Sequence, residues 1–234
     1  AESAAPATDT PVRGGQLVYA VEGDVTSLCL PEGQLAIAGM QIARAIYDPL
    51  VIPNDKGGYS PYLAKSVEAS ADFKTWTITL RDGITFHNGK SLTADDVVAT
   101  INYHIGPDSK SPAKEYLPGV TSVKADGPDT VVIELASGNV DLPFGFTDYH
   151  LSIYPSTDGK IEWEKGIGAG PYILKSYEPG VKLVGERNPN FFKDTWFDGI
   201  EMITIADVAA RTNAYLSGEV HFIDRADLKT IDML

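Results

Sequence analysis

The chain has 234 residues, and 43% hydrophobic with 22% charged residues is an ordinary composition for a globular protein. Its 32 acidic residues against 19 lysines and arginines give a formal net charge of −13. This charge argues against nucleic acid and anionic lipid surfaces as partners, because both attract basic proteins. No apolar run is long enough to span a bilayer, so no direct membrane insertion is expected.

The first fifth of the chain predicts a tail, a strand and a helix. Residues 1–10 are small and polar, which is typical of the end that remains after a signal peptide is removed. A strand is predicted over Gln16–Val21, with a loop over residues 23–32 after it. A helix is predicted over residues 34–47, because apolar residues recur there on one stripe: Leu35, Ala38, Ile42 and Ile46.

Residues 63–105 carry the clearest local pattern. Trp76, Ile78 and Leu80 alternate with threonines, which predicts a strand over Thr75–Leu80 with one buried face. A preceding strand near residues 67–71 would pair with it as a hairpin. Thr93 and Asp96 have the spacing of a capping box, so a helix is predicted to begin directly after Thr93.

The rest of the chain again alternates strands with turns. A hairpin is predicted over residues 120–125 and 130–136, and another strand over residues 151–154. Beyond the glycine-rich segment 166–171, strands are predicted at 172–177, 182–186, 201–205 and 220–223, with a helix at 208–217. The pattern as a whole predicts a mixed α/β (α+β) protein.

Several segments also resemble one known family. The run at residues 81–97 reads R-D-G, I-T-F-H-N-G and then L-T-A-D-D-V, and later come G-A-G-P-Y at 168–172, E-R-N-P-N at 186–190 and G-E-V at 218–220. In that order these motifs resemble family 5 of the extracellular solute-binding proteins. Those proteins are receptors of ABC importers for dipeptides, oligopeptides, nickel chelates and some sugars or opines. Ala169 and Phe192 depart from the family pattern, which more often has threonine and tryptophan there.

The resemblance implies the fold and its division. We expect a type II periplasmic binding protein-like fold that comprises domains I and II of a three-domain family. Domain I would contain residues 1–32 and 169–234, and domain II residues 33–168, so the chain would be an N-terminal portion that lacks the third domain. Gly168, Gly170 and Pro171 are predicted to form the hinge where the chain crosses back to domain I, because hinges concentrate in a few permissive residues.

The resemblance also implies the function. We expect a non-catalytic periplasmic receptor that captures a small solute by lobe closure and delivers it to the membrane subunits of an ABC importer. A short peptide is the expected ligand, and a nickel chelate, a sugar or an opine is the alternative within the same class. No cofactor is expected. No metal site is expected either, because none of the four histidines has the spacing of a zinc site.

Two loops at strand ends are the candidate ligand contacts, since the resemblance places them at the cleft. The six candidate residues are Asp24, Thr26, Ser27, Asp148, Tyr149 and His150. Asp24 is suited to bind an amine, and apolar Phe144 and Phe146 flank the second group, as in pockets that combine apolar walls with a few polar groups. In both loops the alternative is an ordinary polar turn.

A hydrolase is the rival function of another class. It would use Cys29, the only cysteine, or some of the acidic residues. Cys29 lies between Leu28 and Leu30 without a recognisable Cys-His signature, which favours a small buried apolar residue over a nucleophile. The acidic residues form no evident acid–base pair. We therefore do not expect an enzyme.

Overall fold

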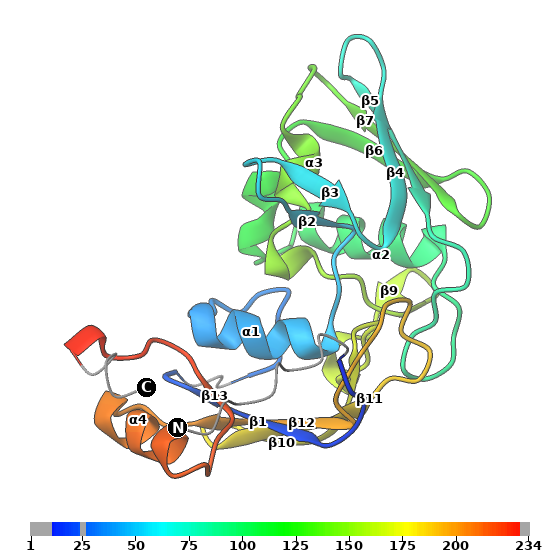
Figure 1. Cartoon of the computed structure of the whole chain (residues 1–234). Coiled ribbons are helices and arrows are strands. Elements are labelled where there is room, and N and C mark those ends of the chain that lie inside the picture. The colour runs from blue at the N-terminus through cyan, green and yellow to red at the C-terminus, as the bar shows by residue number, and fades with distance from the viewer. Residues whose placement is uncertain (1–10, 24–26, 230–234) are drawn as a thin grey trace.

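The computed structural model describes residues 11–23 and 27–229. It has two parts, each built on its own β-sheet, with helix α1 between the two sheets (Figure 1). The predicted mixed helix-and-strand architecture is confirmed. Within the described part of the chain, no helix combines the length and the apolar character needed to cross a membrane.

The first part is a five-stranded sheet with the order β10-β11-β12-β1-β13. Its central strand β1 (Gln16–Val21) pairs in parallel with β12 (Gly199–Thr204) and with the short β13 (Phe222–Ile223). β10 (Tyr172–Glu178) and β11 (Lys182–Arg187) form an antiparallel hairpin that continues the sheet beyond β12. Residues near the start of the chain thus lie beside residues some 180 positions later.

Two helices accompany this sheet. α1 (Ile37–Ile46) packs on it through Ile42, Ala43 and Ile46, which share a buried cluster with Leu183 and Met202 of the strands. α4 (Val208–Leu216) connects β12 to β13 and begins at Asp207, whose carboxylate accepts a hydrogen bond from the Ala210 amide at 2.8 Å.

The second part is an antiparallel four-stranded sheet with the order β4-β5-β7-β6. It consists of β4 (Ala64–Ala69), β5 (Thr75–Leu80), β6 (Val120–Ala125) and β7 (Thr130–Leu135), so both predicted hairpins are confirmed. The apolar face of β5 is buried as its alternation predicts.

α2 (Ala94–Ile105) covers one face of the four-stranded sheet. It begins after Thr93, whose amide donates to the Asp96 carboxylate at 3.0 Å, so the predicted helix start is confirmed. Asp96 is fully buried and also accepts from the amide and the hydroxyl of Ser156, at 2.7 and 2.8 Å. Lys90 forms an ion pair with the same carboxylate.

Short elements complete the second part and connect it to the first. They are β2 (Val51–Pro53), β3 (Tyr59–Pro61), η1 (Pro112–Tyr116), α3 (Leu142–Gly145), η2 (Tyr149–Leu151), β8 (Ser156–Thr157), β9 (Lys160–Ile161) and η3 (Trp163–Lys165). The strand predicted at residues 151–154 is wrong. The chain turns there because Asp148 caps η2, and Ser152 forms only an isolated bridge with Pro49.

The division into residues 1–32 with 169–234 and residues 33–168 stays a prediction. The strands of the five-stranded sheet fall in the first set and those of the four-stranded sheet in the second. α1 belongs to the second set by residue number, yet it packs on the five-stranded sheet. The packing therefore favours grouping α1 with that sheet.

Candidate ligand-binding site

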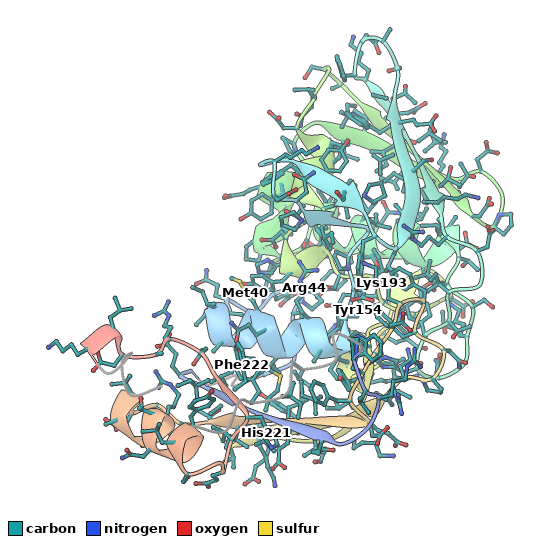
Figure 2. All side chains as sticks on the ribbon, in the orientation of Figure 1. Met40, Arg44, Tyr154, Lys193, His221 and Phe222 are labelled. Atoms are coloured by element: carbon teal, nitrogen blue, oxygen red, sulfur yellow. The ribbon has the colours of Figure 1, made fainter. Side chains whose placement is uncertain are left out.

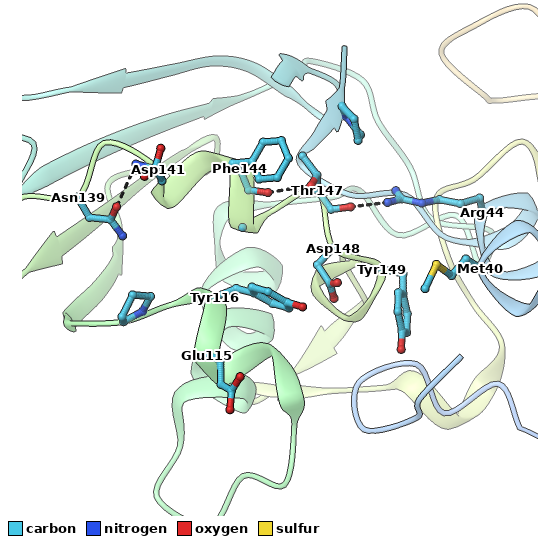
Figure 3. A pocket seen from close by; sticks show the side chains of 13 residues that line it. Met40, Arg44, Glu115, Tyr116, Asn139, Asp141, Phe144, Thr147, Asp148 and Tyr149 are labelled. Atoms are coloured by element: carbon cyan, nitrogen blue, oxygen red, sulfur yellow. Dashed lines mark hydrogen bonds between the residues drawn. The ribbon is translucent and has the colours of Figure 1, made fainter. Parts of the chain in front are cut away.

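A cavity of about 590 Å³ opens between α1 and the segment from η1 to η2 (Figure 3). Its walls are largely apolar or aromatic: Met40, Pro53, Tyr116, Pro118, Phe144 and Tyr149. In Figure 2, Met40 and Arg44 point from α1 toward the part that holds the four-stranded sheet. The cavity thus lies where the two parts of the molecule meet, and its volume is in the range of small-molecule sites.

Asp148 is the carboxylate in the middle of this cavity. Its Oδ1 accepts hydrogen bonds from the His150 amide at 3.0 Å and from His150 Nδ1 at 2.5 Å. The His150 ring stacks on Tyr149, with the ring centroids 3.9 Å apart. This local turn explains why Asp148, Tyr149 and His150 act as one rigid group: the side chain of the first caps the turn that contains the other two.

Tyr149 connects this group to the loop before α1. Its hydroxyl donates to the Gly33 carbonyl at 2.9 Å and accepts from the Leu35 amide at the same distance. Burial raises the pKa of this phenol, so it stays protonated as a donor. The ring is therefore a fixed wall of the cavity.

Arg44 lies at the other end of the cavity, in the last turn of α1. Its Nη2 donates to the Thr147 carbonyl at 2.7 Å, and its buried Nη1 has no hydrogen-bond partner among the described residues. Burial lowers the pKa of the guanidinium, and the charges of Asp48 and Asp148 oppose that shift. Asp48 itself is 2% exposed, and burial raises its pKa to about 7.

Two further carboxylates, Glu115 and Asp141, also line the cavity. With Asp148 they make three acidic groups against the one guanidinium of Arg44. The lining can therefore offer hydrogen-bond acceptors and a negative potential to a molecule that enters an otherwise apolar space.

Of the candidate residues in the first predicted loop, the structure describes only Ser27. Asp24 and Thr26 are outside the described residues. Ser27 is exposed, and its hydroxyl accepts from the Cys29 amide at 3.0 Å. It lines a separate cavity of about 530 Å³ together with Cys29 and Trp163, so the structure does not bring Ser27 together with Asp148 in one cavity.

The three candidate residues of the second predicted loop have different positions relative to the cavity. Asp148 and Tyr149 line the cavity, whereas His150 is 4% exposed, does not line it and holds Asp148 instead. Their contact with a ligand stays a prediction. Sequence reasoning missed Arg44 and Tyr116, which come from distant elements. A basic residue in the last turn of a largely apolar helix was the one available signal.

The predicted hinge residues are closely packed. A Cβ atom on Gly168 would lie 2.1 Å from the Ile46 carbonyl oxygen, and one on Gly170 would lie 2.6 Å from it. Neither residue is among the glycines with positive φ, so glycine is required here because no side chain would fit beside the Ile46 backbone. His87 Nε2 donates to the Gly170 carbonyl at 3.0 Å, which the neutral ring can do while its Nδ1 accepts from the Gly168 amide at 3.3 Å.

Asn188 fixes the same segment from the other side. Its amide nitrogen Nδ2 donates to the Gly170 carbonyl at 3.0 Å, and its backbone amide donates to the Pro171 carbonyl at 2.8 Å. The segment from Gly168 to Pro171 is thus the point where α1, the turn at His87 and the loop after β11 converge. A hinge role for these three residues stays a prediction.

Metal binding and nucleophilic catalysis find little support in the geometry. Residues 11–23 and 27–229 contain no group of three or more His, Cys, Asp or Glu side chains placed to hold a metal ion. Burial raises the pKa of the Cys29 thiol, the opposite of what an activated nucleophile needs.

Comparisons with known proteins place the chain in a family. Residues 58–234 match the sequence model of the bacterial extracellular solute-binding proteins, family 5 Middle. The oligopeptide-binding protein AppA of Bacillus subtilis is 26% identical over 246 residues, covering 98% of this chain and 45% of AppA. The nickel-binding periplasmic protein of Escherichia coli is 28% identical over 187 residues, covering 76% of this chain and 35% of that protein.

Solved structures agree on the fold. The binding protein AgaA of A. tumefaciens R10, solved with agropinic acid, superimposes with a TM-score of 0.84 at 24% identity, over 94% of this chain and 45% of AgaA. AppA of Bacillus subtilis, solved with a nonapeptide, gives 0.83 at 21% identity, over 96% and 46%. The chain spans about half the length of these relatives or less. The family is one of solute-binding proteins rather than enzymes, and this chain belongs to it: it is a member of family 5 of the bacterial extracellular solute-binding proteins.

Proposed function

We propose that this protein is a periplasmic receptor that captures a short peptide and delivers it to the membrane subunits of an ABC importer. The observation that carries the proposal is the family membership over residues 58–234. Several relatives are named for oligopeptides or murein peptides, among them AppA of Bacillus subtilis and MppA of Escherichia coli.

The cavity beside α1 supports this proposal by its chemistry. Apolar walls tolerate varied side chains, while a few fixed polar groups, above all Asp148, orient a ligand. Asp148 is held in place because it caps the turn η2. We propose that this site binds and releases a solute without changing it.

Lobe closure is the proposed mechanism. A ligand that contacts both lobes binds the closed state more tightly than the open one, and this difference in affinity shifts the population toward closure. We place the hinge at Gly168, Gly170 and Pro171, between the units of residues 1–32 with 169–234 and residues 33–168. The convergence of three backbone segments there would confine the motion to few torsions.

The competing ligand classes are a nickel chelate, a sugar and an opine. A nickel-binding protein and AgaA, solved with agropinic acid, are among the relatives. The described residues of this chain provide no cluster of three or more side chains that could hold a metal ion.

A thermal-shift series with the protein produced from its complete gene tests the proposal. The ligands are trialanine, a nickel–histidine complex, sucrose and agropinic acid, each at several concentrations. A ligand at 100 times its Kd stabilises the folded state by about 2.7 kcal/mol, which is a readily measured rise in Tm. We expect that rise for the peptide. A rise for another class alone would contradict the peptide ligand, and no rise with any of the four would contradict the proposed function.

A further inference from the structure

We propose that the cavity beside α1 is a binding site for the cationic amine of a ligand, with Asp148 as its counter-ion and Tyr116 and Tyr149 as its aromatic walls. This inference deepens the proposed function, on which it rests, by naming the chemical class of the ligand group: an aliphatic ammonium, as on a lysine side chain or an amino terminus. Three observations support it.

The first observation is the state of the Asp148 carboxylate. Oδ1 is occupied by the two donors of His150, and Oδ2 forms none of the hydrogen bonds found in the described part of the chain. The carboxylate is therefore held in place by one oxygen and offers the other. Because it lines the cavity, the free oxygen can accept from an entering donor, and an ammonium is the donor that also satisfies its charge.

The second observation is the aromatic surroundings of that carboxylate. Figure 3 shows Asp148 between Tyr116 and Tyr149, and all three line the cavity. An aromatic ring attracts a cation to its face, by about 0.5–1 kcal/mol at an exposed site and more in a desolvated one. Tyr149 is fixed by its bonds to the loop before α1, and Tyr116 is 46% exposed at the rim.

The third observation is the balance of charge in the lining. Glu115, Asp141 and Asp148 oppose the one guanidinium of Arg44. Arg44 offers little to an anionic ligand, because its Nη2 already donates to the Thr147 carbonyl and its Nη1 is buried away from the surface. The cavity therefore favours a cation over an anion of the same size.

Small probes test the site without assuming the natural ligand. The 234-residue chain, labelled with 15N, is titrated with butylammonium chloride, 1-butanol and sodium butyrate at pH 7 and constant ionic strength, and amide shifts are followed by NMR. We expect butylammonium to shift amides around Tyr116 and Asp148 with an affinity at least tenfold above that of butanol, and butyrate to bind weakest.

Variants locate the effect. Asp148→Asn keeps an oxygen for His150 but replaces the free oxygen with an NH2 group and removes the negative charge, and we expect it to lose the tenfold preference for butylammonium. Glu68→Gln removes one charge from the exposed side of β4 and is the matched control that keeps the preference. If Asp148→Asn does not fold, Tyr116→Leu at the rim replaces it, with an expected loss of severalfold in affinity for butylammonium but not for butanol.

The titrations can refute the amine site without refuting the peptide ligand, and the reverse also holds. Equal affinities for butylammonium and butanol, shifts away from the cavity, or an unchanged preference in Asp148→Asn or its replacement would overturn the amine site, even if peptides bind. A preference for butylammonium that depends on Asp148, combined with no binding of peptides, would support the amine site and overturn the peptide ligand.

Discussion

Replacing Gly168 with alanine tests whether the predicted hinge segment depends on close packing. The added Cβ would lie 2.1 Å from the Ile46 carbonyl oxygen and 2.9 Å from both the Ile46 carbonyl carbon and Tyr47 Cδ1. The backbone at the end of α1 must therefore move away by about an ångström, and it is the same backbone that accepts a hydrogen bond from the Gly170 amide at 3.0 Å.

The expected cost follows from the nature of the clash. Overpacking typically destabilises by about 1–3 kcal/mol, and a clash with backbone belongs at the upper end of that range, because backbone cannot rotate away as a side chain can. We therefore expect Gly168→Ala to lower the free energy of unfolding by about 3 kcal/mol. In a chain of this length that corresponds to a fall of roughly 6–12 °C in Tm.

Urea unfolding followed by circular dichroism is the assay, with Gly58→Ala as the matched control. A Cβ on Gly58 would meet only the Asn54 side chain, at 3.6 Å or more, and Gly58 has no positive φ. The control should be neutral or more stable by about 0.4–1 kcal/mol, because alanine restricts the unfolded chain. If Gly168→Ala is as stable as the control, the segment is not held by close packing.

Three more predictions concern the core, pH and the thiol. Asp96→Ala should lower the free energy of unfolding by about 3–5 kcal/mol in urea melts, because it leaves Lys90 and the buried donors of Ser156 without their acceptor. Burial lowers the pKa of His104 to about 4, below its unfolded value of 6.5. The neutral ring should therefore contribute to the free energy of unfolding above pH 6.5, and this contribution should be lost as the pH falls from 6.5 to 4. His104→Asn should lose less stability over that range, and a loss identical to that of the unsubstituted protein would refute the assignment. Cys29 should react slowly with a thiol reagent at pH 7, and rapid labelling would revive the hydrolase alternative.

The local structure could be predicted where it depends on neighbours in sequence. The alternation of Trp76, Ile78 and Leu80 and the pairing of Thr93 with Asp96 both act within a few residues, and both were confirmed. The strand at residues 151–154 was wrong because the Asp148 side chain caps a turn there, and local hydrogen bonding outweighed the apolar pattern.

The site could be predicted only in part for a different reason. Asp148 and Tyr149 follow each other in a loop with polar and aromatic character, so the sequence alone could mark them. Arg44 and Tyr116 join them only in the folded chain, across separations of about 30 to 100 residues, and no periodicity reports such contacts. Gly168 and Gly170 have no room for a side chain beside the Ile46 backbone, a constraint that the sequence alone does not report, and their role as a hinge stays a prediction.

The central claim is that this protein binds a peptide and leaves it unchanged. The most direct measurement incubates the protein produced from its complete gene with an isotope-labelled tripeptide, isolates the complex by rapid gel filtration and analyses the bound material by mass spectrometry. We predict one intact peptide per protein molecule. Cleaved peptide in the bound or free fraction, or no retained peptide at concentrations that saturate a related receptor, would contradict the account.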